Sequence, residues 1–159
     1  MDLMRVLLVE DDEVVHRALG FLIDLLPGCA LVGVALTVGQ ALEAVARLRP
    51  DVVLMNADLP GALPAIGHLR AAGQSPADTA AKPLRIVLLS VYGRGERAAR
   101  ASGADAYLLK DCGPGALCAA LRGESPGPRG GADTAPATWT PSVGCAPPAP
   151  DPERRAPWD

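Results

Sequence analysis

The sequence is poor in aromatic residues, in positive charge and in long apolar runs. Aromatic residues make up only 3% of the 159 residues, so a folded core must be built mainly from Leu, Val, Ala and Ile. Lys and Arg number 15 against 18 Asp and Glu, which gives a formal net charge of −3. This balance argues against a nucleic-acid-binding surface, which needs a basic patch. No apolar run approaches the roughly 20 residues of a membrane span.

Cysteine is scarce and irregularly spaced. The four cysteines, Cys29, Cys112, Cys118 and Cys145, form neither a C-x-x-C motif nor paired metal-binding spacing. We interpret them as small buried or incidental thiols of a reducing compartment. The first segment, MDLMRVLLVEDDE, becomes acidic by Glu10 and therefore does not resemble a signal peptide. The expected location is the cytoplasm.

The first 122 residues alternate between strand-like and helix-like segments. Short apolar runs predict strands at residues 5–10, 30–36, 51–56, 84–90 and 105–110. Helical spacing of apolar residues predicts helices at residues 14–26, 38–49, 63–73, 95–103 and 115–122. This alternation predicts an α/β fold with a doubly wound, five-stranded parallel sheet, (βα)5, whose ligands bind at the carboxyl ends of the strands.

Residues 123–159 have a different composition from the rest. Nine of these 37 residues are Pro and five are Gly, and Val143 is the only Val, Leu, Ile or Phe among them. So little apolar surface cannot offset the entropy of ordering. We therefore predict a globular domain at residues 1–122 and a Pro/Gly/Ala-rich disordered tail at 123–159. A role for Trp139 and Trp158 as partner anchors is a minor alternative.

Polar residues follow four of the predicted strands. The first strand leads into Glu10, Asp11 and Asp12, the third ends at Asn56, the fourth at Ser90 and the fifth at Lys110. Adjacent acids repel one another unless a cation or a lysine lies close by, and hard oxygen ligands suit Mg²⁺. Alternatively, the acidic turn only caps the first helix. The hydroxyl and the lysine at neighbouring strand ends favour a site.

Four segments together resemble the receiver domain of bacterial response regulators: VLLVEDDEVVHRAL, PDVVLMNADLPG, IVLLS and GADAYLLKD. The sequence of the last segment is closest to that of the subfamily that carries a C-terminal helix-turn-helix. The resemblance spans about residues 4–122. It implies the flavodoxin-like receiver fold and a role in two-component, phosphorelay signal transduction and transcription regulation.

The resemblance also implies roles for single residues. Glu10 and Asp11 match the acidic pair that holds Mg²⁺, and Asp58 would offer its backbone carbonyl to the metal. Asn56 occupies the position of the aspartate that accepts a phosphoryl group from a histidine kinase. An amide oxygen is a poor nucleophile, so no acyl phosphate can form on it. With one carboxylate fewer, any Mg²⁺ site at Glu10, Asp11, Asn56 and Asp58 is expected to be weak.

Three further residues match the switch of the family. Ser90 matches the hydroxyl that follows the phosphoryl group, Tyr107 the rotating aromatic of the output face, and Lys110 the lysine that pairs with phosphate. Without an aspartate at position 56, Lys110 must pair with Glu10 or Asp11.

Other features also depart from the family. GRG at residues 93–95 opens a helix poorly, so a weak or partly unwound fourth helix is expected. No pair of amphipathic helices follows residue 122. Four other side chains could in principle take part in phosphotransfer, but none is placed to replace an aspartate at position 56: Asp51, Asp58, His16 and His68.

We therefore predict an atypical pseudo-receiver that is not an enzyme and regulates by binding, without phosphorylation. The expected partners are a protein on the face of the fourth helix, fifth strand and fifth helix, a small molecule at the strand-end pocket, or a second copy. Direct nucleic-acid or membrane binding is not expected, and no cofactor is required. The alternative is a truncated or frameshifted transcriptional regulator without its DNA-binding half. An enzyme or nucleotide-binding domain is disfavoured because the sequence contains neither the dinucleotide-binding glycine motif nor a P-loop.

Overall fold

The computed structural model describes residues 3–74 and 82–124. Its strands are β1 (Met4–Val9), β2 (Cys29–Ala35), β3 (Val52–Asn56), β4 (Arg85–Ser90) and β5 (Ala106–Leu109). Its helices are α1 (Glu13–Leu25), α2 (Val38–Leu48), α3 (Ala62–Gly73), the 3₁₀ turn η1 (Gly93–Gly95), α4 (Glu96–Ala101) and α5 (Pro114–Arg122). Nearly all of the predicted tail, with Cys145, Trp139 and Trp158, lies outside the described residues.

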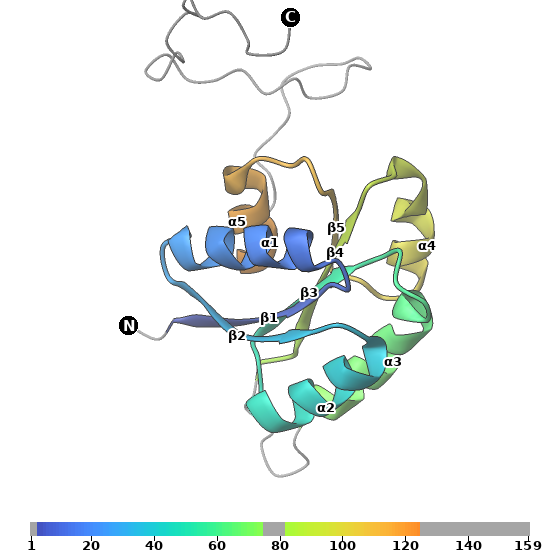
Figure 1. The fold of residues 1–159 in the computed structure, drawn as a ribbon. Coiled ribbons are helices and arrows are strands. Elements are labelled where there is room, and N and C mark those ends of the chain that lie inside the picture. The colour runs from blue at the N-terminus through green and yellow to red at the C-terminus, as the bar shows by residue number, and fades with distance from the viewer. Residues whose placement is uncertain (1–2, 75–81, 125–159) are drawn as a thin grey trace, which may run out of the picture. The chain divides into compact units, whose positions relative to one another are not determined.

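The five strands form one parallel sheet in the order β2-β1-β3-β4-β5 (Figure 1). This order confirms the predicted doubly wound α/β fold of the flavodoxin-like receiver type. The order changes direction between β1 and β3, so the loops that follow these strands lie next to each other at one edge of the sheet. That edge contains the residues singled out in the sequence.

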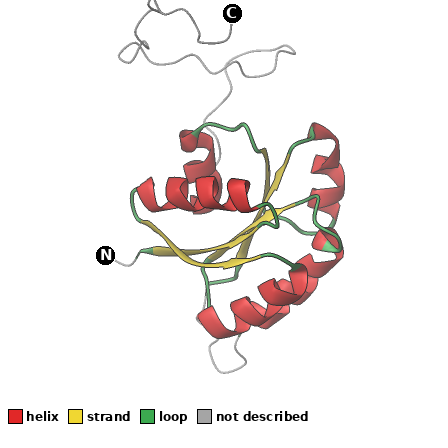
Figure 2. Ribbon diagram, in the orientation of Figure 1, coloured by secondary structure: helices red, strands yellow, loops and turns green. Residues whose placement is uncertain are grey.

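Helices cover both faces of the sheet (Figure 2). Strand residues such as Val6, Leu8 and Leu54 point to one face and pack with Ile23 of α1 and Leu117 of α5. The strand residues between them point to the other face, where they pack against α2, α3 and Ala99 of α4. Both faces are thus apolar, which explains why the strands read as continuous apolar runs in the sequence.

Polar side chains cap the N-termini of α1 and α2. Oδ1 of Asp12 accepts hydrogen bonds from the backbone N–H groups of Val14 and Val15, at 2.9 and 3.0 Å. Oγ1 of Thr37 accepts from the N–H of Gln40, whose own side chain accepts from the N–H of Leu36. Such capping satisfies the N–H groups that the first turn leaves free. The acidic turn therefore caps α1 through Asp12, which leaves Glu10 and Asp11 for other contacts.

The fourth helix is short, as the sequence predicted. Residues 95–103 do not form one helix, because α4 runs only from Glu96 to Ala101 and follows the 3₁₀ turn η1. Neither η1 nor α4 has a side-chain cap at its start. Gly93 and Gly95 also add backbone entropy that an α-helical turn would have to lose.

The amino end of the sheet is held by arginines. Arg5 donates to the carbonyl of Leu48 at the end of α2, and Arg85 donates to the carbonyl of Ala120 in α5, each at 2.7 Å. Arg70 donates to the carbonyl of Leu84 and pairs with Asp105 at 2.7 Å. Positive groups at helix C-termini stabilise the carbonyls left free there. Among the described residues, no helix is long and apolar enough to cross a membrane.

Candidate functional site

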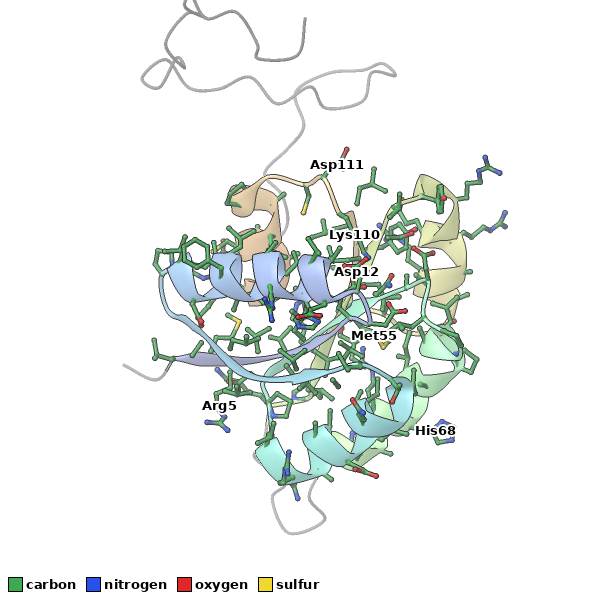
Figure 3. All side chains as sticks on the ribbon, viewed as in Figure 1. Arg5, Asp12, Met55, His68, Lys110 and Asp111 are labelled. Carbon is green, nitrogen blue, oxygen red and sulfur yellow. The ribbon has the colours of Figure 1, made fainter. Side chains whose placement is uncertain are left out.

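Four neighbouring strands deliver polar side chains to one edge of the sheet. Glu10 and Asp11 follow β1, Asn56 ends β3, Ser90 ends β4 and Lys110 follows β5. The structure brings together the residues that the sequence placed at the strand ends. In Figure 3, the labelled Lys110 and Asp12 lie at this edge, whereas His68 lies on the outer side of α3, well away from it. His68 is exposed and His16 lies within α1, so neither belongs to the site.

The side-chain amide of Asn56 lies between two carboxylates. Its Nδ2 atom donates to Oε1 of Glu10 at 3.1 Å and to Oδ1 of Asp11 at 3.4 Å. Its Oδ1 atom accepts from the backbone N–H of Asp58 at 3.1 Å. Turning the amide over would point its oxygen at two carboxylates and its NH₂ at an N–H group, so these partners fix its orientation. The amide nitrogen therefore faces the acidic pair.

Lys110 completes this arrangement through Glu10. Its Nζ atom lies 2.7 Å from Oε2 of Glu10, a residue that is only 1% exposed. A buried carboxylate needs such compensation, because desolvation disfavours its charged form. Glu10 also accepts from the N–H of Asp12 at 3.3 Å. The sequence did not decide whether Lys110 pairs with Glu10 or with Asp11. In the structure, the lysine pairs with the buried Glu10 and not with the exposed Asp11.

Asp58 turns its side chain away from the acidic pair and toward Ser90. The hydroxyl Oγ of Ser90 lies 3.1 Å from Oδ2 of Asp58 and 3.3 Å from Oδ1. The same Oγ accepts from the backbone N–H of Tyr92 at 3.0 Å. Ser90 is 1% exposed. Its hydroxyl thus donates to Asp58 and accepts from the loop that leads into η1.

Tyr107 closes the outer side of this network. Its hydroxyl donates to the backbone carbonyl of Tyr92, and its ring lies against Gly95. A Cβ atom at Gly95 would lie 2.8 Å from the Tyr107 hydroxyl oxygen, so only glycine leaves room for the ring in this position. Asp58, Ser90, Tyr92, Arg94 and Tyr107 line an open depression of about 450 Å³ next to α3.

These residues do not fit a magnesium site in this arrangement. Mg²⁺ requires oxygen ligands around it, but the amide nitrogen of Asn56 faces the two carboxylates and Glu10 is paired with Lys110. Among residues 3–74 and 82–124, no group of three metal-ligating side chains comes together. The disagreement with the metal set expected from the resemblance arises at Asn56, where an NH₂ group replaces a carboxylate oxygen.

Sequence reasoning did not identify several contacts at this edge. Tyr92, Arg94 and Gly95 line the depression or seat Tyr107, yet their segment predicts only a poor helix start. The contact between Asp58 and Ser90 was also missed. Asp58 follows β3 and Ser90 ends β4, which are neighbouring strands with Asn56 opposite Leu89. This register places the side chains of Asp58 and Ser90 at the same level of the sheet.

A family model for the response regulator receiver domain matches residues 6–122 of the chain. This chain belongs to the response regulator receiver domain family. The receiver domain is 33% identical over 120 residues to the nitrate/nitrite response regulator protein NarL of Escherichia coli, a match that covers 73% of this chain and 52% of NarL. It is 33% identical over 115 residues to the uncharacterised transcriptional regulatory protein YvfU of Bacillus subtilis, covering 69% of this chain and 52% of YvfU.

A solved structure supports the same assignment. The receiver is 30% identical to the LuxR-family two-component response regulator from Aurantimonas sp. SI85-9A1, with a TM-score of 0.64, covering 77% of this chain and 88% of that one. The chain spans about half the length of NarL and YvfU. A similarity to a protein-glutamate methylesterase of Syntrophus aciditrophicus covers only 17% of that enzyme and carries no argument for esterase activity. The family and its transcriptional relatives are regulators.

Proposed function

We propose that this receiver signals by binding, without phosphorylation at residue 56 or at any acceptor that replaces it. The observation that carries the proposal is the position of the Asn56 amide, which donates to Glu10 and Asp11. A receiver that accepts phosphate needs a carboxylate oxygen as nucleophile, and an amide oxygen cannot form the acyl phosphate. The amide also supplies hydrogen bonds to the two acids, so this edge is held together without a metal ion.

The signal would then come from a partner that distinguishes two arrangements of the Ser90–Tyr107 region. A ligand shifts such an equilibrium only if it binds one arrangement more tightly than the other. Two surfaces support this reading. The depression lined by Asp58, Arg94 and Tyr107 offers a carboxylate, a guanidinium and an aromatic ring to a small molecule. Beside it, Val91 and Tyr92 are 61% and 65% exposed and offer an apolar contact to a protein.

Intact mass after incubation with acetyl phosphate and Mg²⁺ tests the proposal. We expect no phosphate adduct on the native chain. The matched variant Asn56→Asp restores the carboxylate and is expected to gain one phosphate. An adduct on the native chain that disappears in Asp58→Ala would show that Asp58 takes over as acceptor, and the proposal would be wrong.

A transcriptional regulator is the second candidate function. It is favoured by NarL and YvfU, in which the matched region makes up only 52% of the protein. The proposal is that a helix-turn-helix segment is encoded after the receiver, in the same or a shifted reading frame. Sequencing and translating the downstream DNA in three frames tests it, because a gene region without such a segment rules this candidate out.

A further inference from the structure

A cavity of about 1030 Å³ lies at the amino end of the sheet, opposite the edge that contains Asn56. The first residues of β1, β3 and β4 form part of its wall. In Figure 3, the labelled Arg5 marks this end of the sheet and lies well away from Lys110. Among the described residues, none in the wall belongs to the network around Asn56 or to the depression beside Tyr107. The cavity is therefore separate from the proposed function.

The wall of this cavity is basic. Of the described residues that line it, two are acidic, Asp51 and Asp105, and five are positively charged: Arg49, Arg70, Lys82, Arg85 and Arg122. The formal net charge of the chain is −3, so the cavity has the opposite sign to the molecule as a whole. A concave wall of one sign focuses the electric field and concentrates ions of opposite charge. The cavity therefore attracts anions.

Three of the arginines in the wall keep their positive charge uncompensated. Arg70 forms an ion pair with Asp105 at 2.7 Å. Within residues 3–74 and 82–124, no such pair involves Arg49, Arg85 or Arg122. Each of these three donates a hydrogen bond to a backbone carbonyl at or near the C-terminal end of a helix. A carbonyl fixes a guanidinium group without cancelling its charge, and a guanidinium group has five N–H donors. Donors and charge therefore remain for a ligand.

Arg49 stands where glycine is normally favoured. It ends α2 with φ of 48°, the only positive φ of a non-glycine residue in the described part of the chain. This left-handed conformation costs an ordinary residue about 1 kcal/mol or more, and glycine is the usual choice at the end of a helix. The hydrogen bond from Arg49 to the carbonyl of Gly73 is long, at 3.4 Å, and offsets little of this cost. A guanidinium group that binds a ligand would account for an arginine here.

We propose that this cavity binds a nucleoside di- or triphosphate. Guanidinium groups match phosphate oxygens with paired hydrogen bonds, and three of them without a carboxylate suit several adjacent phosphate groups. The exposed apolar side chains of Leu3 and Pro83 line the same cavity and offer contacts to a base and sugar. Its volume matches the upper end of the range for small-molecule sites, about 300–1,000 Å³.

The nucleotide-binding motifs that the sequence lacks do not bear on this cavity. A P-loop or a dinucleotide-binding motif holds phosphate on the backbone N–H groups of a glycine-rich loop, whereas here side-chain guanidinium groups hold it. The wall contains no aromatic side chain among the described residues, so no base is stacked between rings. The phosphate groups therefore supply most of the affinity, and adenine and guanine nucleotides should bind alike.

Isothermal titration calorimetry of the full chain, with EDTA and about 0.15 M KCl, tests the proposal. We expect ATP and GTP to bind with similar dissociation constants below about 1 mM. AMP, with one phosphate group, should bind about tenfold or more weakly. Tripolyphosphate has the phosphate groups without the nucleoside and should bind less tightly than ATP. If it binds at least as tightly, free polyphosphate replaces the nucleotide as the ligand. No binding of ATP or tripolyphosphate up to about 1 mM, or equal binding of AMP and ATP, would overturn the proposal.

Substitution of Arg49 assigns the binding to the cavity. Arg49→Gly removes a guanidinium group and suits the positive φ, so the fold should lose little stability, while the dissociation constant for ATP should rise about tenfold. The matched control is Arg47→Gln, which removes the same charge from an exposed residue of α2 outside the wall and should leave the constant almost unchanged. Arg122→Gln is a second variant and should also weaken binding. If the arginines only stabilise helix ends, melting temperatures change and affinities do not, which would contradict the proposal.

Amide shifts in NMR spectra locate the bound ATP. We expect shifts at the first residues of β1, β3 and β4, around Met4, Val52 and Arg85. Shifts centred on Asn56 and Ser90 would place ATP at the other edge of the sheet and overturn the proposal. The intact-mass experiment on Asn56 does not involve this cavity, so each of the two proposals can fail without the other.

Discussion

The Nζ atom of Lys110 lies 2.7 Å from Oε2 of Glu10, so the lysine at the end of β5 neutralises a carboxylate that is almost fully buried after β1. This contact joins the two ends of the folded domain, residues 100 positions apart in the chain. Together with the hydrogen bonds from Asn56 to Glu10 and Asp11, it links the ends of β1, β3 and β5 at the acidic edge of the sheet.

Removing the lysine is expected to be costly. Lys110→Met leaves Glu10 buried without its partner, which should lower the free energy of unfolding by about 3 kcal/mol. The measurement is urea denaturation of both proteins. The matched control is Arg100→Met, whose pair with Glu96 joins side chains that are 75% and 50% exposed and should be worth less than about 1 kcal/mol.

A double variant distinguishes lost charge compensation from lost packing. In Glu10→Gln with Lys110→Met, no unpaired charge remains, so much of the lost stability should return. If the double variant is as unstable as Lys110→Met, the ion pair is not what stabilises this edge.

The close approach of Gly95 to Tyr107 predicts a second effect. Gly95→Ala adds a Cβ atom 2.8 Å from the Tyr107 hydroxyl oxygen, so the ring must move and stability should fall by about 1–3 kcal/mol. The backbone itself is not the obstacle, because Gly95 has φ of −87°. The shift of the Tyr107 ring resonances in NMR spectra measures the displacement, and thermal melting measures the cost.

Gly93→Ala is the matched control for Gly95. It lies in the same 3₁₀ turn, but a Cβ atom there meets nothing within 4 Å. It should leave Tyr107 in place and stabilise the fold slightly, by about 0.4–1 kcal/mol, through the lower entropy of the unfolded chain. Equal shifts of Tyr107 in both variants would show that the glycine does not seat the ring.

Cys29 predicts a loss of stability at alkaline pH. Burial raises the pKa of this thiol above its ordinary value of 9.0, helped by the nearby Cys118. The folded state therefore holds the proton more tightly than the unfolded state. Its contribution is complete below pH 9.0 and is lost as the pH rises toward the higher pKa of the folded state. Urea denaturation between neutral and alkaline pH should show a smaller loss in Cys29→Ala than in the native chain. Equal losses in the two proteins would contradict this.

Much of the fold could be predicted from the sequence because its signals are local. Each strand is a short apolar run, and each helix except the fourth carries apolar residues at helical spacing. The site could be placed at the strand ends because parallel strands all end at one edge. The choice of Glu10 over Asp11 as the partner of Lys110 was not predictable, since it depends on which carboxylate the folded sheet buries.

The direction of the Asp58 side chain also depends on distant residues. Its carboxylate accepts from Ser90, which lies 32 positions away in the chain and reaches it only through the pairing of β3 with β4. The exposed apolar residues of α1, Val14, Phe21 and Leu25, present the opposite case. Their spacing is visible in the sequence, but the same pattern is typical of a core-facing helix. Only the structure shows that α1 has a second, outward apolar side.

Restoring the missing carboxylate should create a metal-dependent protein. Asn56→Asp removes the amide donor between Glu10 and Asp11 and adds a third negative charge there, so the variant should be less stable than the native chain without metal. Mg²⁺ should then stabilise it, by about 2.7 kcal/mol at 100 times the dissociation constant. The native chain should show almost no response, because its amide nitrogen faces the acids. Thermal melting with MgCl₂, against NaCl of equal ionic strength, separates binding from screening. An equal rise in the native chain would mean that Asn56 turns its oxygen toward a bound metal, contrary to the arrangement seen here.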